Sequence, residues 1–345
     1  MGIPIDLPEH MAAACNFAMD QDGRPLFVLI AKRTFHILNQ SSLALAPTQQ
    51  EVNLAGEFWG DAGVSSYKYE PEFAFFKPST DVVLLGHGCA QNSRDRFVDV
   101  SIRVGDVIKK SVRVFGDRTW VKRMGIVDMT NPSTFERIPL IYERAFGGWD
   151  TAQPDPLASK FECRNPVGVG FKRVQWEEGM TLPNLEDPQN LIGVYGDSPA
   201  PAGFGFVSPD WYPRSRFAGT YDKEWEQERA PMLPEDFDVR FFNAASHGMV
   251  SPSYLRGDEA VVLENVSNIG PFLFSLPGVA APTIRIQLRT GPDHVLESRL
   301  DTVVINADDC MLVMLWRTSL PLKNGPHDVV AVNVECPQVP RQILP

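Results

Sequence analysis

Histidine, cysteine and serine most often carry metal or nucleophilic chemistry, and this chain spaces them too widely for either. His87 and Cys89 form its one close His/Cys pair, whereas zinc sites draw on two ligand pairs at short spacing. No Gly-x-Ser-x-Gly elbow is present, and nothing places a base beside Cys89 or Cys163. We therefore predict no metal site, expect His87 in a turn between strands, and expect the thiols to be buried and inert.

Carboxylates offer a second chemistry, because two of them at the right separation act as acid and base in glycoside hydrolysis. Each candidate also has a structural interpretation, such as a helix cap for Asp222 or an ion pair with Arg144 for Glu143. The sequence does not bring any two to a defined separation, so we predict no catalytic residue. The candidates are Glu143, Asp222, Glu224, Glu235, Asp236 and Asp238.

Glycine-rich phosphate loops are also missing their defining features. Gly168-Val169-Gly170 and Gly203-Phe204-Gly205 lack both the third glycine and the strand-to-helix context of a dinucleotide fingerprint. Both pairs are better interpreted as places where the chain turns. We therefore predict no cofactor.

What remains is a dense set of aromatic and arginine side chains between residues 142 and 243. The stretch is rich in Gly and Pro, which favour irregular backbone, but a disordered linker would lack its large aromatics. Trp, Tyr and Arg are the residues most enriched at binding hot spots. We therefore predict an ordered loop platform that binds a partner through Trp149, Trp176, Trp211, Tyr212, Arg214, Arg216, Tyr221, Trp225 and Arg229.

The alternative is that these side chains form a private core that holds the loops still. Either interpretation suits a single residue, and for the whole set we expect part core and part interface. Replacing Trp211 and Arg214 with alanine separates the two. Loss of a complex without unfolding indicates an interface, and loss of folding indicates a core.

Strands on both sides of the platform must position it. Residues 98–104 alternate between apolar and polar, and Gly105-Asp106 supplies a two-residue turn into a second alternating run, which predicts a hairpin. One short helix is predicted after Asp222, ending before Pro231. Further strands are predicted at 26–38, 81–85, 238–243, 260–263, 284–288, 300–305, 310–316 and 329–334.

These elements indicate a mainly β fold. We expect a sandwich or barrel-like pair of antiparallel sheets, with a long ordered loop-rich insertion and at most short helices. The predicted parts are a β-rich segment 1–146, the loop-rich platform 147–234 and a β-rich segment 235–345. They form one compact unit or two interlocked β subdomains.

Composition limits the partners and the compartment. The net charge of −11 disfavours a nucleic-acid partner, and the apolar runs are too short to span a bilayer. The first 16 residues lack the basic start of a secretory signal, and five scattered cysteines favour a reducing compartment. We predict a cytoplasmic protein that binds neither nucleic acid nor membrane, with its oligomeric state open.

Several strings between about residues 25 and 275 carry a family resemblance. They are Lys32-Arg33-Thr34-Phe35, Asp81-Val82-Val83-Leu84-Leu85-Gly86, Gly116-Asp117-Arg118-Thr119-Trp120, Tyr142-Glu143-Arg144-Ala145-Phe146-Gly147-Gly148, Asn165-Pro166-Val167-Gly168, Leu182-Pro183-Asn184-Leu185-Glu186, Gly203-Phe204-Gly205, Ala218-Gly219-Thr220-Tyr221-Asp222 and Arg240-Phe241-Phe242-Asn243. Together they resemble the bacterial domain-of-unknown-function 2169 family. The Ser246-His247-Gly248 string departs from the family pattern, in which a Pro or an acidic residue is expected nearby.

Members of that family look like accessory proteins of type VI secretion systems in Gram-negative bacteria. The resemblance implies a non-enzymatic adaptor or chaperone that binds a toxic effector and helps load it onto the spike and its PAAR-type tip. It brings no catalytic residues. Two alternatives stay open: a hydrolase that uses the loop carboxylates on a carbohydrate or peptide, and a structural secretion component that binds no cargo. A deep pocket with convergent, perturbed groups would favour the hydrolase, and a flat or grooved aromatic surface would favour the adaptor.

Overall fold

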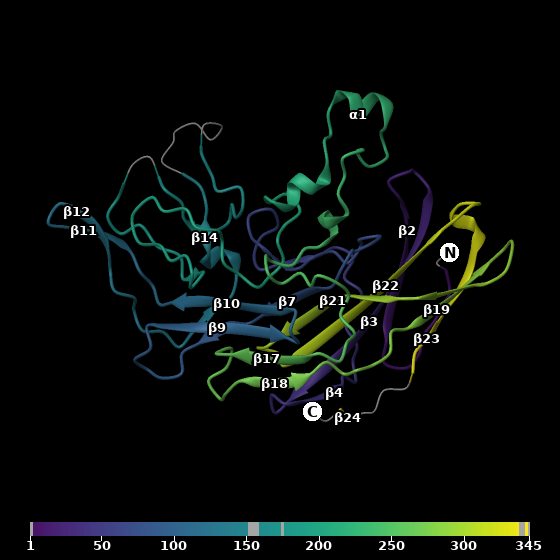
Figure 1. The fold of residues 1–345 in the computed structure, drawn as a ribbon, viewed down its shortest axis with the longest axis horizontal. Helices are drawn as coiled ribbons and strands as arrows, with labels where there is room; N and C mark the ends of the chain where they lie inside the picture. The colour runs from purple at the N-terminus through teal and green to yellow at the C-terminus, as the bar shows by residue number, and fades with distance from the viewer. Residues whose placement is uncertain (1–2, 151–158, 174–175, 338–341, 344–345) are drawn as a thin grey trace.

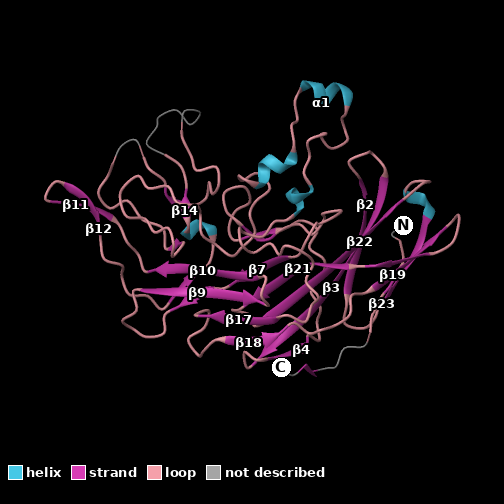
Figure 2. Ribbon diagram, in the orientation of Figure 1, coloured by secondary structure: helices cyan, strands magenta, loops and turns pink. Residues whose placement is uncertain are grey.

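The computed structural model describes residues 3–150, 159–173, 176–337 and 342–343 of the chain. Strand makes up 39% and helix 6% of the protein, and Figure 2 shows sheets running through the body of the molecule with helices limited to short turns. The predicted mainly β class is confirmed. Among these residues there is no helix with the length and apolar character that crossing a membrane requires.

In chain order the strands are β1 (Ile5–Asp6), β2 (Ala12–Met19), β3 (Pro25–Leu38), β4 (Ser42–Leu45), β5 (Glu57–Phe58), β6 (Tyr67–Tyr69), β7 (Asp81–Leu85), β8 (His87–Cys89), β9 (Phe97–Val104), β10 (Ile108–Phe115), β11 (Trp120–Arg123), β12 (Ile126–Met129), β13 (Arg137–Pro139), β14 (Phe146–Gly147), β15 (Val169–Gly170), β16 (Leu185–Glu186), β17 (Ala260–Glu264), β18 (Phe272–Ser275), β19 (Thr283–Leu288), β20 (His294–Glu297), β21 (Arg299–Asn306), β22 (Met311–Pro321), β23 (Val329–Glu335) and β24 (Gln342–Ile343). The helical segments are η1 (Tyr142–Arg144), η3 (Arg214–Ala218), α1 (Lys223–Glu228), η4 (Val239–Phe242) and η5 (Pro326–Asp328).

The largest sheet has the order β24-β4-β3-β22-β21-β7, with β2 also paired to β3. β3 is long enough to hold two partners on one edge, β2 along its first half and β4 along its last residues. Its other edge pairs with β22 along most of its length. All these pairings are antiparallel except β21 with β7, which is parallel. Strands from the beginning and the end of the chain therefore interleave in one sheet.

A five-stranded antiparallel sheet, β16-β10-β9-β17-β18, contributes the other wall of the main hydrophobic core. The alternation predicted in β9 is confirmed, because Val98, Val100 and Ile102 are buried while the residues between them are at least partly exposed. Val104 pairs with Ile108, so the β9–β10 turn has three residues and the predicted two-residue turn was wrong. Fully burying each apolar side chain of β9 contributes about 1.5–3 kcal/mol to the free energy of unfolding.

A four-stranded sheet, β1-β23-β19-β20, packs against the N-terminal half of β3 and encloses a second hydrophobic core. Phe27 and Leu29 of β3 belong to this core together with Ile284 and Ile286 of β19, whereas Ile30 of β3 belongs to the main core. Both faces of β3 are thus covered. This explains why its sequence has apolar runs on both sides of Lys32-Arg33-Thr34 and lacks the alternation of a half-buried strand.

One predicted strand was wrong. Residues 238–243 contain the short helix η4, in which the Asp238 side chain accepts a hydrogen bond of 2.9 Å from the Arg240 N–H. Such a local bond from a side chain to the backbone favours a helical turn over a strand. The helix predicted after Asp222 is confirmed as α1, and it ends at Glu228.

Candidate partner-binding surface

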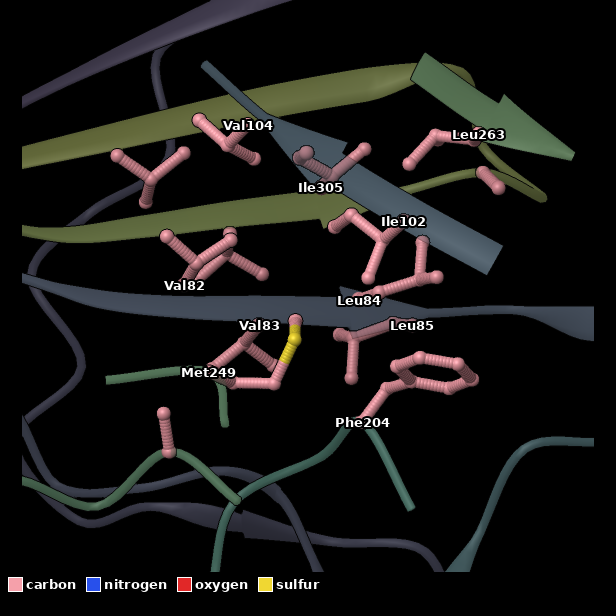
Figure 3. Close-up of a cluster of buried hydrophobic side chains, with 14 of the residues drawn as sticks. Val82, Val83, Leu84, Leu85, Ile102, Val104, Phe204, Met249, Leu263 and Ile305 are labelled. Atoms are coloured by element: carbon pink, nitrogen blue, oxygen red, sulfur yellow. The ribbon is translucent and has the colours of Figure 1, made fainter. Parts of the chain in front are cut away.

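The loop platform and the segment that follows it, residues 235–250, are mounted on the edge of β7. The Val82 N–H donates to the Met249 carbonyl at 2.9 Å. The Leu84 N–H donates to the Phe204 carbonyl at 3.2 Å. Figure 3 shows Leu84 on the side of β7 that faces the five-stranded sheet, and Leu85 on the opposite side, toward Phe204. The Met249 and Phe204 carbonyls therefore give hydrogen-bond partners to N–H groups on the edge of β7 that would otherwise be unpaired.

The buried carboxylate of Asp81, at the start of β7, attaches the segment after η4 to the large sheet. Asp81 is fully buried and accepts hydrogen bonds from Lys77 Nζ at 2.8 Å, from Asn243 Nδ2 at 2.9 Å and from the Ala244 N–H at 2.8 Å. A buried charge is tolerated when it is paired and its lone pairs are occupied. Asn243, at the end of η4, is in this way tied to the large sheet.

Arg214 belongs to the interior of the platform. It is 6% exposed, and its guanidinium forms an ion pair of 2.5 Å with Glu70. Its Nε donates to the Phe241 carbonyl at 2.8 Å and its Nη1 to the Val207 carbonyl at 2.7 Å. Burial raises the pKa of Glu70 in spite of this pairing. Arg214 therefore holds together chain segments that lie far apart in the sequence.

Trp211 is also interior. It is 4% exposed and packs edge-on against Tyr142, with ring centroids 5.3 Å apart. The structure corrects the expectation that Trp211 and Arg214 present a surface, because both lie in the core and contact neighbouring segments of the chain. We call the buried region around Trp211, Arg214 and Asn243, where the platform meets the segment that follows it, the root.

A protruding loop follows the root. We call residues 220–236 the lasso, and Figure 1 shows it standing out from the body of the molecule with α1 at its tip. Its base is closed by Asp236, which accepts hydrogen bonds from the N–H and the hydroxyl of Thr220 at 2.9 and 2.8 Å. Asp222 caps α1 by accepting from the Trp225 N–H at 2.9 Å. Both carboxylates therefore have structural roles.

Aromatic side chains give the lasso its exposed surface. Tyr221 is 53% exposed and packs edge-on against the half-buried Trp225, with ring centroids 4.7 Å apart. The Trp225 indole N–H donates to the Met232 carbonyl at 2.8 Å, which fixes the ring. Arg229 donates to the carbonyls of Leu233 and Gln21 and so ties the lasso to the turn between β2 and β3. Arg229 thus mainly orders the loop.

The lasso is strongly acidic. Residues 220–236 contain six carboxylates and two cations, a net charge of −4. A hollow of about 250 Å³ is lined by Trp225, by five carboxylates that include Glu224 and Glu228, and by one cation, Arg229. Glu224 and Glu228 lie one helical turn apart and have no ion-pair or hydrogen-bond partner among the described residues. Like charges at this spacing repel each other, so the hollow favours a cationic group.

The remaining predicted residues lie elsewhere. Tyr212 and Arg216 are exposed, and the Arg216 guanidinium donates to the Tyr212 hydroxyl at 3.3 Å. Trp149 is 44% exposed and stacks on the equally exposed Phe161. Trp176 is half-buried, with its indole N–H lacking a hydrogen-bond partner within the described part of the chain. The nine predicted residues therefore do not form one continuous surface.

A second hollow, of about 700 Å³, contains the groups that come nearest to catalytic chemistry. It is lined by Cys89, Arg137 and Asp308 among others. His87 lies in β8 beside it, not in a turn as predicted, and its Nδ1 lies 2.7 Å from Asp308 and 2.8 Å from Arg137. Burial raises the pKa of the Cys89 thiol, so it is protonated at neutral pH and a poor nucleophile.

The loop carboxylates serve local structure. Glu143 accepts hydrogen bonds from the N–H and hydroxyl of Ser66 at 2.6 and 2.8 Å, and the expected ion pair with Arg144 was wrong, since Arg144 lies nearer Asp117. Asp238 pairs with Arg240. No group of three or more His, Cys, Asp or Glu side chains that could hold a metal is found among residues 3–150, 159–173, 176–337 and 342–343.

Lys110 makes long-range contacts that the sequence did not predict. From β10 it donates to Ser246 Oγ at 2.9 Å and to the His247 carbonyl at 2.7 Å, and it lies over the Phe204 ring. Burial lowers the pKa of Lys110 to about 7. In the sequence Lys110 is an ordinary polar position of an alternating strand, and its partners lie about 136 residues away. No local signal marks it.

Comparison with known proteins agrees with the resemblance that the sequence strings carry. The profile of a family described as an uncharacterized protein conserved in bacteria (DUF2169) matches residues 22–317. No curated protein and no solved structure matches the chain. Because the matched region covers most of the 345 residues, the chain belongs to the DUF2169 family of bacterial proteins.

Proposed function

We propose that this protein is a non-enzymatic adaptor or chaperone that binds a type VI secretion effector and helps load it onto the spike and its PAAR-type tip. The secretion system comes from the family resemblance in the sequence. The lasso is the part of the predicted platform that we propose as the binding surface, and its order and exposure in the structure support this choice. The cytoplasm, where effectors are loaded before firing, is the expected compartment.

One observation carries the proposal: the lasso is held in a fixed conformation, yet it exposes aromatic and acidic side chains to solvent. Its base, helix cap and indole are fixed by hydrogen bonds, yet Tyr221 is 53% exposed and Glu224 and Glu228 line a hollow beside Trp225. A loop held rigid in this way loses little entropy on binding. Tyr and Trp are among the residues most enriched at binding hot spots.

A partner with a basic surface suits this site. The lasso carries a net charge of −4 and the whole chain −11, so a cationic effector segment would be attracted at long range and paired at contact. Such attraction is screened by salt beyond about 8 Å at physiological ionic strength. Complex formation should therefore weaken at high salt.

Co-expression with the products of neighbouring toxin and tip genes tests the proposal. The wild-type protein is expected to retain or solubilise one of them. The double variant Tyr221→Ala, Trp225→Ala is expected to lose it while keeping a cooperative unfolding transition. The matched control is Phe97→Ala, because Phe97 is similarly exposed (51%) but lies on β9. If no neighbour is retained by the wild type, or the lasso variant retains it as well as the control does, the proposal is wrong.

A hydrolase is the second candidate, favoured only by the hollow beside Cys89. The groups there are already paired, with Arg137 contacting both His87 and Asp308. Hydrolysis of a carbohydrate or peptide that is lost in an Asp308→Asn variant would support this function over the adaptor.

A further inference from the structure

The β11–β12 hairpin carries an apolar tip that nothing in the described molecule covers. Trp120 pairs with Met129 and Arg123 with Ile126, which leaves Met124 and Gly125 as the turn. Met124 is completely exposed (102%) and Ile126 is 71% exposed. Figure 1 shows the hairpin projecting from one end of the molecule.

The turn also violates local sequence preferences. Met124 has φ of 50° and Gly125 has φ of 85°, so both central residues adopt the left-handed conformation of a type I′ turn. Asn, Asp and Gly are favoured at the first such position, and a large apolar residue there is unusual. A residue that is unfavourable both in backbone conformation and in solvent exposure is a candidate for a binding role.

The base of the hairpin is rigid. Trp120 is 4% exposed and packs edge-on against Tyr195, with ring centroids 5.4 Å apart. Its N–H donates to the Met180 carbonyl at 2.9 Å, and its carbonyl accepts from the Gly179 N–H at 2.8 Å. A small third core that includes Trp120 and Leu182 supports this base. The tip is therefore held out by a fixed support.

The charges around the tip are positive. Residues 122–126 contain two cations, Lys122 and Arg123, and no carboxylate. Arg123 reaches Asp128 at 3.4 Å, but more than half of the Arg123 side chain is exposed. An exposed pair of this kind holds its partners weakly. The tip thus offers an apolar knob with cations beside it.

The lasso of the same protein has the complementary features. Its hollow of about 250 Å³ is smaller than a typical small-molecule site. It is lined by Trp225 and by five carboxylates, among them Glu224 and Glu228, against one cation, Arg229. Sulfur makes favourable contacts with aromatic rings, which suits Met124. Figure 1 shows the hairpin and the lasso well separated along the molecule, so one molecule's tip does not reach its own hollow.

We propose that the protein associates head to tail with a second copy of itself, the β11–β12 tip of one copy entering the lasso hollow of the next. Met124 packs on Trp225, and the cations beside it pair with Glu224 and Glu228. The surfaces are different on the two copies, so the contact is heterologous and extends into chains or closes into a ring. The contact area is small, so association is weak and depends on concentration and salt.

This inference does not require the proposed adaptor function, although a partner bound at the lasso would compete with it. The net charge of −11 makes whole molecules repel each other. At physiological salt that repulsion is screened beyond about 8 Å, and the local pairing of opposite charges decides the contact.

Sedimentation velocity over a concentration series tests the inference. The average mass of the wild type should rise with concentration at physiological salt, where the repulsion between whole molecules is screened, and fall back in about 0.5 M salt, where the local charge pairs are screened as well. Met124→Asp and Glu228→Arg should each weaken association about tenfold or more. Glu226→Gln is the control, because Glu226 lies on the same helix but does not line the hollow.

The decisive experiment mixes two variants, one with an altered tip and one with an altered hollow. Met124→Asp keeps its hollow and Glu228→Arg keeps its tip, so the mixture should form dimers of one copy each and no longer chains, although neither variant associates alone. Both substitutions are on exposed side chains, so folding is retained and is checked by circular dichroism. A wild type that stays monomeric at every concentration, a mixture that stays monomeric, or association that survives Met124→Asp would overturn the inference.

Discussion

The root and the lasso of the platform contain the same residue types in opposite environments. In the root, Arg214 is 6% exposed and paired with Glu70, and Trp211 is 4% exposed. In the lasso, Tyr221 is 53% exposed and Trp225 is half-buried. A Trp and an Arg close together in sequence therefore do not distinguish an interface from a core.

What separates the two regions is the origin of their contacts. Arg214 binds Glu70, Val207 and Phe241, so it joins distant segments. Trp225 contacts nearby residues, such as Tyr221 and Met232. The root is part of the global fold, whereas the lasso is a local structure attached to it.

The largest expected effect is in the root. Arg214→Met leaves Glu70 buried without its partner, which should cost about 3–5 kcal/mol in the free energy of unfolding. Chemical denaturation measures this cost, and adding Glu70→Gln should recover part of it. Arg216→Met is the control, because Arg216 is exposed, and should change stability by less than about 0.5 kcal/mol. Equal effects at positions 214 and 216 would contradict the assignment of Arg214 to the core.

A pH-dependent effect is expected at Lys110 of β10, which contacts Phe204, Ser246 and His247. The pKa of Lys110 is lowered from its ordinary value of 10.5 to about 7 by burial. Between these values the unfolded chain holds a proton that the folded protein has released, so the contribution of Lys110 to stability improves as pH rises from 7 to 10. Below pH 7 both states are protonated and the unfavourable contribution is complete.

Lys110→Met removes this dependence. Relative to the wild type, the variant should be most stable at pH 6 to 7 and should lose that advantage steadily toward pH 10. Denaturation curves across this range measure the difference. Lys109→Met, at an exposed position of the same strand, should follow the wild-type profile. Parallel profiles for wild type and Lys110→Met would show that the amine titrates normally.

Removing the lasso should affect stability much less than altering the root. The hydrogen bonds from Thr220 to Asp236 hold its two ends together, so a Gly-Gly linker in place of residues 221–235 should close the gap. Beyond its base, the lasso is joined to the body of the protein by a few hydrogen bonds around Gln21, which the deletion removes. We expect stability to fall by about 1–2 kcal/mol with a cooperative transition retained. Loss of cooperative unfolding would show that the lasso belongs to the core.

The smallest effects lie within the lasso itself. Glu228→Gln should raise stability by about 0.2–0.5 kcal/mol, because it removes repulsion from Glu224 one turn away. Asp222→Ala should lower it by about 1 kcal/mol, because it removes the cap of α1. Thermal unfolding of the two variants measures the difference, and shifts in the same direction would contradict the roles given to these carboxylates.

The sequence predicts the fold where the pattern is local. Alternation identified β9, β10 and β19, and an apolar run identified β3. β2 was missed because its Ala-rich sequence carries no alternation, and η4 was mistaken for a strand because Asp238 caps it locally. The division of the platform into root and lasso could not be predicted, since it depends on Glu70, which lies 144 positions before Arg214.

The most direct test of the central claim combines folding and binding in one variant. The protein with residues 221–235 replaced by Gly-Gly is co-expressed with the neighbouring toxin or tip protein that the wild type retains. We predict that it unfolds cooperatively and elutes without that partner, because the lasso carries the binding surface and the root carries the fold. A folded variant that still retains the partner would contradict the claim.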